Sequence, residues 1–185
     1  VEFEKTVEEL GKKILDPSKS YYYNEDKWIF YLKCKKHNIP TPETILLSES
    51  SSVLKHELKS FNKMPLVLKR VEGTCGEFVE KADTISEAVK IIKKWRKNNQ
   101  LIPLIAQELV RSPSYRITVI DKKIIQTELK MNKGWKATGN YAKKIFKFKL
   151  DKNLEKIVEK IIRVSKLKIC GIDFLKRGDE WRALE

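Results

Sequence analysis

The two halves of this sequence differ in how their apolar residues are spaced, and this difference restricts the fold more than any other feature. Between residues 43 and 95, short apolar runs typical of strands (43–48 and 66–71) alternate with segments typical of helices (50–61 and 85–95). From residue 102 onward, strand-like runs follow one another at 102–110, 115–121 and 123–129. We therefore expect both helices and sheets, and 185 residues allow one large domain or two small ones.

Local signals add helices and strands near both ends. Apolar stripes predict helices over 1–15 and 26–36, the second with Asn24 as a potential cap, and Thr84 to Glu87 matches a capping box. Residues 143–150 alternate charged and apolar side chains, which predicts a strand with one wet face. Asp151 is expected to cap an amphipathic helix, and a hairpin over 168–176 and 180–185 is expected to end the chain.

The composition is that of a folded, basic protein. It has 39 Lys and Arg against 25 Asp and Glu, a net charge of +14, which favours anionic partners but also keeps a chain in solution. No apolar run approaches the roughly 20 residues that span a bilayer, and no signal peptide is recognisable, so we expect a cytoplasmic protein without a membrane partner. Three widely spaced cysteines indicate reduced thiols rather than a disulfide framework.

A lysine followed by a small glycine loop is the first candidate for chemistry. Lys69 lies in the apolar run 66–71, which leads into the loop between Gly73 and Gly76. A lysine can hold a phosphate as a point charge while backbone N–H groups of a glycine loop surround the other oxygens. The alternative from the residues alone is a hairpin turn beside a surface lysine.

Two carboxylates in the final hairpin form the second candidate. Asp173 and Glu185 stand on strands expected to be adjacent, each beside apolar residues. Burying both is costly unless a cation neutralises them, and hard oxygen ligands suit Mg²⁺. The alternative is that one carboxylate merely lies at the edge of the sheet.

The apolar strand that ends in Gln107-Glu108-Leu109-Val110 is the third candidate. A strand that crosses between two subdomains can offer its backbone to an adenine edge, and a carboxylate there can accept from the exocyclic amine. An ordinary edge strand that ends in a polar turn explains the same residues.

Seven segments, in this order, resemble the ATP-grasp superfamily, and within it the RimK-like amino-acid ligases, over residues 21–185. They are 26–28, 39–44, 65–69 with its glycine loop, 107–110, 115–119, 171–175 and 183–185. The resemblance implies an α+β fold in which two subdomains hold the nucleotide between their sheets. We expect 21–102 to be the N-subdomain and 103–185 an incomplete C-subdomain, with 1–20 as the tail of a missing N-terminal domain. The chain would then be either a fragment or a trimmed protein.

The resemblance also implies roles for individual residues. Lys27 and Lys69 match the lysines that bind the ATP phosphates, and the loop Gly73, Thr74, Cys75 and Gly76 matches the loop that closes over them. Glu108 and Leu109 match the hinge that binds adenine, with Gln107 and Val110 as its neighbours. Ser114 replaces a family aspartate near the ribose.

Four further residues of this sequence match positions that serve the reaction in the family. Arg116 corresponds to the arginine that steadies phosphate and acyl phosphate, and Lys136 keeps the charge of another family arginine. Asp173 and Glu185 correspond to two of the three magnesium ligands, the third being an asparagine two positions after the glutamate.

The implied reaction is ATP-dependent amide or peptide bond formation between a carboxylate and an amine through an acyl phosphate. An amino acid such as glutamate would be added to a small molecule or a protein, with an acidic acceptor suiting the positive charge. Two Mg²⁺ ions are expected, with Mn²⁺ as the alternative ion, and homo-oligomerisation stays open.

Two other functions stay open. A basic nucleic-acid-binding module is supported by the charge, by Tyr21 to Tyr23 and by lysines around Trp95 and Trp135, but no recognised motif supports it. A degenerate ATP-grasp domain would bind nucleotide without catalysis, which Ser114 and Thr138 allow because both depart from the family pattern.

Overall fold

The computed structural model describes residues 2–73, 76–98, 102–131, 134–136 and 142–185, with main chain only at 21–24 and 98. Contacts divide the chain into two compact units, one of Val1–Thr41 with Arg111–Glu185 and the other of Pro42–Val110. Residues 21–41 thus group with the C-terminal part of the chain, and the second division lies after residue 110. The domain boundaries expected from the sequence, after residues 20 and 102, differ from both divisions.

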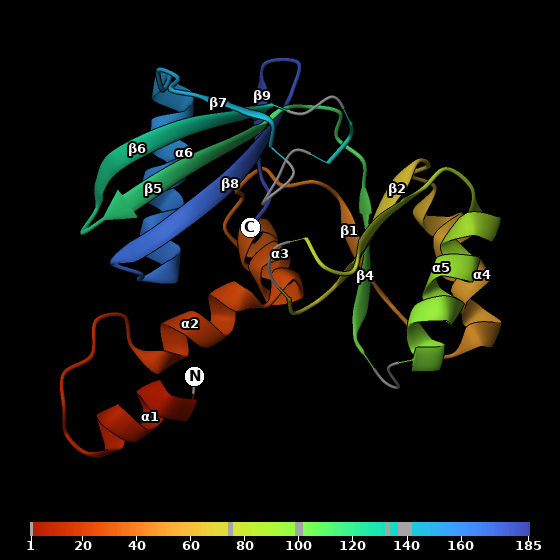
Figure 1. The fold of residues 1–185 in the computed structure, drawn as a ribbon, viewed down its shortest axis with the longest axis horizontal. Helices are drawn as coiled ribbons and strands as arrows, with labels where there is room; N and C mark the ends of the chain where they lie inside the picture. The colour runs from red at the N-terminus through yellow and green to blue at the C-terminus, as the bar shows by residue number, and fades with distance from the viewer. Residues whose placement is uncertain (1, 74–75, 99–101, 132–133, 137–141) are drawn as a thin grey trace. The chain divides into compact units, whose positions relative to one another are not determined.

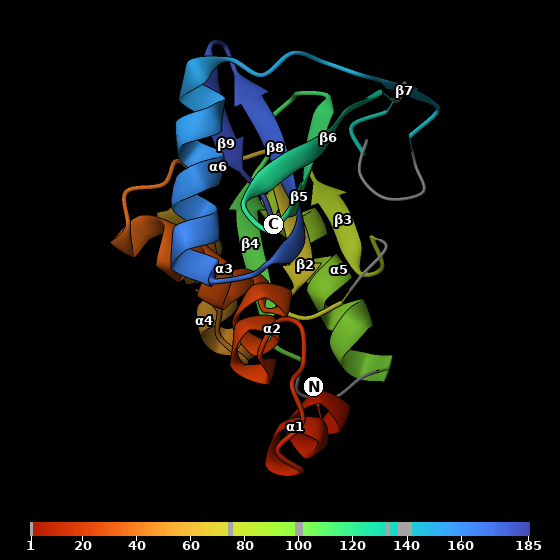
Figure 2. The same cartoon turned by 90° about the vertical axis from the view of Figure 1, so that its left-hand side faces the viewer.

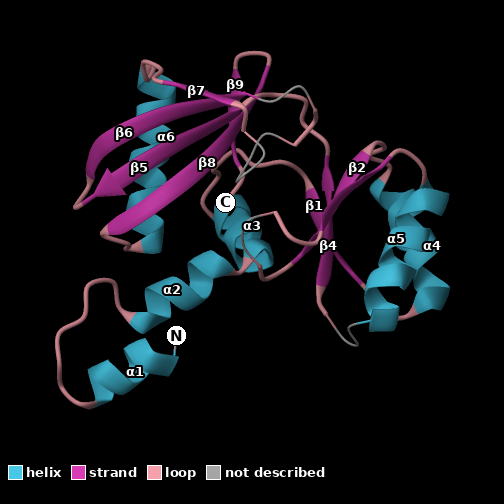
Figure 3. Ribbon diagram, in the orientation of Figure 1, coloured by secondary structure: helices cyan, strands magenta, loops and turns pink. Residues whose placement is uncertain are grey.

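The smaller unit is a four-stranded antiparallel sheet with two helices packed on it (Figure 1). The strand order is β1-β4-β2-β3, with β1 Thr44–Leu47, β4 Leu104–Glu108, β2 Leu66–Arg70 and β3 Val79–Ala82. Helices α4 Ser51–Phe61 and α5 Ile85–Asn98 lie side by side (Figure 3). Leu54, Leu58, Leu68 and Ile92 belong to the core between helices and sheet.

The predicted helix start at Thr84 is confirmed. The N–H of Glu87 donates to Thr84 Oγ1 at 3.2 Å, and the Thr84 N–H donates to Glu87 Oε2 at 3.3 Å, which is the reciprocal pair of a capping box. Strand β3 was not predicted, since it has four residues and two of them, Glu80 and Lys81, are charged.

The larger unit is built on a five-stranded antiparallel sheet of order β7-β6-β5-β8-β9. The strands are β5 Ser114–Ile120, β6 Lys123–Met131, β7 Lys144–Phe146, β8 Ile169–Arg177 and β9 Glu180–Ala183. Helix α6 Lys152–Ser165 lies along one face of this sheet, as the two views in Figures 1 and 2 show. Its predicted apolar stripe, including Leu154, Val158 and Ile161, is buried in a core with Ile117 and Phe174.

Three predicted elements differ from the observed ones. The helix expected over 1–15 is α1 Glu2–Glu9, whose intended buried residue Phe3 is 75% exposed, and a separate α2 Ser18–Glu25 follows it. Helix α3 Lys27–Lys36 is capped by Asp26, whose side chain accepts from the Ile29 N–H, instead of by Asn24. The strand expected over 143–150 is only three residues long, because it pairs with β6 alone at the edge of the sheet.

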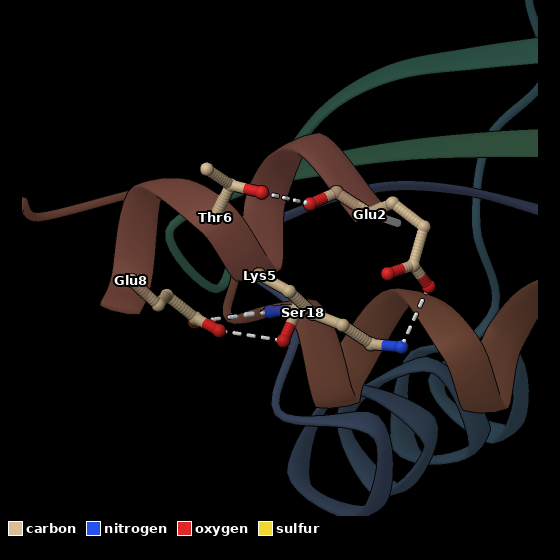
Figure 4. A network of polar contacts seen from close by, with 5 residues as sticks. All are labelled: Glu2, Lys5, Thr6, Glu8 and Ser18. Atoms are coloured by element: carbon tan, nitrogen blue, oxygen red, sulfur yellow. Dashed lines mark hydrogen bonds and ion pairs between the residues drawn. The ribbon is translucent and has the colours of Figure 1, made fainter. Parts of the chain in front are cut away.

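Polar side chains fasten the N-terminal helices to one another (Figure 4). The Glu8 carboxylate accepts from both the N–H and the hydroxyl of Ser18, at the start of α2. Within α1, Lys5 pairs with Glu2 at 2.8 Å. A carboxylate at a helix N-terminus offsets the unpaired N–H groups there, so Glu8 does for α2 what a capping side chain does elsewhere.

Asp16 ties the N-terminal segment to the sheet of the same unit. Its buried carboxylate accepts from the backbone N–H groups of Lys168 and Ile169, the latter at 3.0 Å, where β8 begins. Asp16 directly follows the helix predicted over 1–15, and no tertiary contact was predicted for it. A contact across 152 residues leaves no local pattern in the sequence.

Asp151 caps α6, as predicted, and its carboxylate also accepts from the indole N–H of Trp181 at 2.7 Å. The hydrogen bond from the Leu154 N–H is the largest of several contacts that lower the pKa of this carboxyl. A lowered pKa means that the stabilisation is complete above the unfolded value, near pH 4, and is lost as the pH falls through the folded value.

We therefore expect Asp151→Ala to cost about 1 kcal/mol of unfolding free energy at pH 7, a typical value for a lost cap. The cost should shrink toward zero between pH 4 and pH 2. Urea unfolding at pH 7, 4 and 2.5 measures it, with Asp179→Ala, on an exposed hairpin turn, as the control. An equal cost at all three pH values would contradict the capping role of the charge.

Two cysteines are described as free thiols, as expected. Burial raises the pKa of Cys34 to about 12 and also raises the pKa of Cys170. Cys75 lies outside the described residues. Among the helices that the structure describes, none is both long and apolar enough to cross a membrane.

Candidate functional site

The larger sheet has one face that packs against α6 and an opposite face that carries charged side chains. Ile117 and Ile172 point into the core beneath α6, so the residues next to them in β5 and β8 point to the other face. Arg116 on β5 is paired with Asp173 on β8 and with Glu128 on β6. Directly opposed residues share a face, so three charged side chains form one row across three strands.

Asp173 is the most deeply buried member of this row. Its Oδ2 lies 3.1 Å from Arg116 Nη1, and its side chain is 6% exposed. Its other oxygen, Oδ1, is buried with no hydrogen-bond partner among the described residues. Burial raises the pKa of Asp173; the Arg116 charge opposes that shift and the Glu185 charge adds to it.

Glu185 lies next to Asp173, as predicted for the hairpin. The Asp173 N–H donates to the Glu185 carbonyl, and the Leu184 N–H donates to the Asp173 carbonyl, both at 2.8 Å. The Glu185 carboxylate is 3.5 Å from Nζ of Lys27, at the start of α3. Two carboxylates, one arginine and one lysine that are far apart in sequence thus come together in the larger unit.

This donor set fits a hard divalent cation. The unpartnered Oδ1 of Asp173 is a buried oxygen that a cation would satisfy, and Glu185 supplies a second carboxylate nearby. Within the described ranges, no group of three or more His, Cys, Asp or Glu side chains is placed to hold a metal. Mg²⁺ commonly uses one or two carboxylates and takes its remaining ligands from phosphates and water, so two suffice.

Lys69 occupies a buried position in the smaller unit. It is 7% exposed on β2, paired with Ile105 of β4 and with Val79 of β3. Gln107 is on the same face of the sheet, two residues further along β4, and its amide donates to Thr44 Oγ1 at 2.9 Å. Lys69 is therefore not a surface lysine, although β2 and β3 do pair as the hairpin that the alternative expected. A buried ammonium needs anionic or polar partners.

The segment from Glu108 to Val110 leads out of β4. Both Glu108 and Val110 are buried. The Glu108 carboxylate accepts from the Glu43 N–H at 3.1 Å, and the Leu109 N–H donates to the Pro65 carbonyl at 3.3 Å. Polar groups that the sequence analysis assigned to adenine thus have partners within the smaller unit.

The remaining predicted residues are partly described. Gly73 and Gly76 have φ of +133° and +73°, conformations that favour glycine, while Thr74 and Cys75 lie outside the described residues. Ser114 is completely buried and its hydroxyl has no hydrogen-bond partner in the described part of the chain. Nζ of Lys136 lies over the Trp135 ring at 5.8 Å.

Glu128 and Lys130 were not predicted as site residues. They form an ion pair of 3.6 Å on the charged face of β6, with side chains 22% and 12% exposed. The signal was available, because Gln126 and Glu128 alternate along the strand predicted over 123–129, and Lys130 continues the pattern one residue beyond it. The sequence was interpreted there only as a strand, with no role for its charged residues.

A separate cavity of about 600 Å³ lies in the larger unit, beside the β5–β6 turn and the end of α6, and is lined by Asp121, Lys122, Glu159, Ile162, Arg163, Lys166, Leu167 and Lys168. None of the predicted site residues lines it.

Comparison with known proteins identifies the family. The model of the RimK-like ATP-grasp domain matches residues 24–185, which is most of the chain. This chain belongs to the RimK-like ATP-grasp family. The family and the α+β ATP-grasp fold expected from the seven segments are confirmed.

Curated relatives of this RimK-like chain are ligases. It is 24% identical over its whole length to a coenzyme gamma-F420-2:alpha-L-glutamate ligase of Methanocaldococcus jannaschii, covering 65% of that protein. It is 25% identical over 94% of its length to the alpha-aminoadipate–LysW ligase LysX of Saccharolobus solfataricus, covering 64% of that protein. The chain thus spans just under two thirds of these relatives.

Solved structures share the fold. A D-alanine–D-alanine ligase of Bacillus anthracis complexed with ATP superposes with a TM-score of 0.83 at 16% identity, over 99% of this chain and 61% of the ligase. A RimK domain ATP-grasp protein of Sphaerobacter thermophilus gives 0.80 at 14% identity, over 98% of this chain and 66% of that protein.

Proposed function

We propose that the protein is an ATP-dependent carboxylate–amine ligase that forms an amide or peptide bond through an acyl phosphate. The amino acid that it adds is glutamate or a related acidic amino acid, and the acceptor is a small molecule or a protein. The row of Arg116 and Asp173, with the unpartnered buried Oδ1, is the observation that carries this proposal. The glutamate ligases among its relatives support the choice of amino acid.

Each proposed role follows from charge and position. Two Mg²⁺ ions, or Mn²⁺ in their place, with Asp173 and Glu185 among their ligands, would offset the triphosphate charge. The Arg116 guanidinium, next to that carboxylate, is positioned to stabilise the transferring phosphoryl group. Lys27, in the same unit as Asp173, and Lys136 supply further positive charge for anionic substrate groups.

In the smaller unit, Lys69 is the proposed phosphate ligand. The loop from Gly73 to Gly76 is proposed to close over the phosphates, and the segment from Gln107 to Val110 is proposed to hold the adenine. The hydrogen bonds of Glu108 and Leu109 to Glu43 and Pro65 would hold this segment in shape. Ser114 is fully buried, so the ribose contact proposed for it requires the start of β5 to move.

Nucleotide binding tests the proposal directly. We expect ATP to bind this chain in calorimetry with an affinity that rises when Mg²⁺ is added. Lys69→Ala should weaken that binding by about 10- to 100-fold, since a hydrogen bond to a charged group contributes roughly 1.5–3 kcal/mol.

The matched control for this variant is Lys59→Ala, which removes an equal charge from an exposed position of α4 in the same unit. It should leave the affinity within about twofold, since screening weakens distant surface charges. Equal losses in both variants would mean that overall charge, and not a phosphate site, holds the nucleotide. ATP binding without phosphate release in the presence of glutamate and candidate acceptors would instead favour a degenerate, non-catalytic domain.

A further inference from the structure

Gly171, on the charged face of β8, is the residue whose missing side chain makes room for Arg116. It lies two residues before Asp173, so both are on the same face as Arg116. A Cβ built on Gly171 would lie 2.5 Å from Cζ and 2.6 Å from Nε of Arg116, closer than any carbon atom can approach without displacement. The guanidinium therefore rests on the bare backbone of Gly171 while it reaches Asp173.

The backbone of Gly171 gives no other reason for a glycine. It lies inside β8 and is not among the described glycines with positive φ, which are Gly11, Gly73, Gly76 and Gly178. Glycine within a strand also weakens it, because it has no side chain to pack and loses more backbone entropy on folding. A residue that costs stability and has an ordinary conformation is best explained by the space that it leaves.

We propose that Gly171 is the positioning residue for Arg116: its lack of a side chain lets the guanidinium lie flat on β8 and point at the oxygen of Asp173. Arg116 itself is 38% exposed, and its one described ion-pair partner is Asp173, so packing alone does not hold it. Because the guanidinium is the end of a flexible side chain, a methyl group on residue 171 would move Arg116 away and leave the sheet intact. Gly171→Ala should thus reproduce the loss of Arg116.

The kinetic part of the test rests on the proposed ligase function. Arg116→Ala and Gly171→Ala should each lower kcat by about 100-fold, the size typical of losing one donor to a developing charge, with KM for ATP changed less than threefold. The double variant should lose no more than Arg116→Ala alone. If Gly171→Ala lowers kcat further in the Arg116→Ala background, the glycine does not act through Arg116.

A second measurement follows the environment of the Arg116 guanidinium and does not depend on ligase activity. In spectra of protein with ¹⁵N-labelled arginine, the Nε–H signal of Arg116 is assigned by its absence from Arg116→Lys. We expect Gly171→Ala to shift this signal to the region of freely exposed arginines. An unshifted signal would overturn the proposal, whatever the activity.

Thermal unfolding with a matched glycine completes the design. In the Arg116→Ala background, Gly171→Ala should raise Tm by roughly 1–3 °C, because alanine is the better strand residue once the guanidinium is gone. Gly178→Ala is the control: its φ of +57° disfavours alanine although no atom lies within 4 Å of the added Cβ. Gly178→Ala should lower Tm by the same amount with and without Arg116. If Gly171→Ala also lowers Tm in both backgrounds, the positioning role is contradicted.

Discussion

Replacing Asp173 by asparagine is expected to lower ATP-dependent turnover by about 1,000-fold or more without unfolding the protein. Asparagine keeps the shape of the side chain but loses the charge that a divalent cation needs. Losing a metal's stabilisation of a transition state costs several kcal/mol, and each 1.4 kcal/mol is a factor of ten. The variant removes the charge at the buried Oδ1, which has no hydrogen-bond partner among the described residues, and leaves Glu185 as the remaining proposed carboxylate ligand.

The stability of the same variant should move in the opposite direction. Burial raises the pKa of Asp173, so between the unfolded value near 4 and the folded value the native state binds more protons than the unfolded state. The charge on Asp173 therefore makes stability fall as the pH rises through that window. We expect the Tm of Asp173→Asn not to fall with rising pH in this window. The loss of the ion pair with Arg116 lowers the Tm of the variant and partly offsets this gain.

Two measurements with one control separate these effects. Turnover and the rise in Tm on adding ATP with Mg²⁺ should both be lost in Asp173→Asn and retained in Asp179→Asn. Asp179 lies on the fully exposed turn of the same hairpin, and Lys176, at 3.8 Å, is its ion-pair partner among the described residues. If Asp173→Asn keeps the Mg²⁺-dependent rise in Tm, the magnesium site lies elsewhere.

Removing the carboxylate of Asp16 should cause the largest loss of stability, about 2–4 kcal/mol. Asp16→Ala removes the charged acceptor of the Lys168 and Ile169 N–H groups, and a hydrogen bond to a charged group contributes roughly 1.5–3 kcal/mol. Alanine also disfavours the φ of 64° found at this residue. Urea unfolding measures the loss, and the N-terminal segment should become more sensitive to proteases.

Asp16→Asn is the matched variant for this prediction. Asparagine tolerates a positive φ and keeps one side-chain oxygen as an acceptor, so the loss should be about half as large or less. If Asp16→Ala and Asp16→Asn cost the same, the charge and not the pair of hydrogen bonds is what matters. A cost below about 0.5 kcal/mol for both would mean that the N-terminal segment contributes little to the folded unit.

Elements with strong local signals were predicted well. Helices α5 and α6 each have an apolar stripe and a capping residue, Thr84 and Asp151, so their starts follow from neighbouring residues alone. Helix α1 has a stripe but no core to pack against, and it ends at Glu9. Periodicity records which side of a helix is apolar, whereas only tertiary contacts show whether anything covers that side.

The candidate site divides in the same way. The adjacency of Asp173 and Glu185 was predictable, because a short hairpin determines which residues face one another. The burial of Lys69 and the ion pair of Arg116 with Asp173 could not be predicted from neighbouring residues, because each depends on elements distant in sequence.

Local order in the amino-acid sequence thus specified the starts of α5 and α6, the two hairpins of the larger sheet, the family and the succession of candidate residues. Folding alone brought Asp16 to the start of β8, laid Arg116 over Gly171 and left one oxygen of Asp173 without a partner. The physical reason is the distance along the chain over which each effect acts. Periodicity, capping and turn preferences act over a few residues, whereas burial and the pairing of charges depend on which distant segments the sheet brings together.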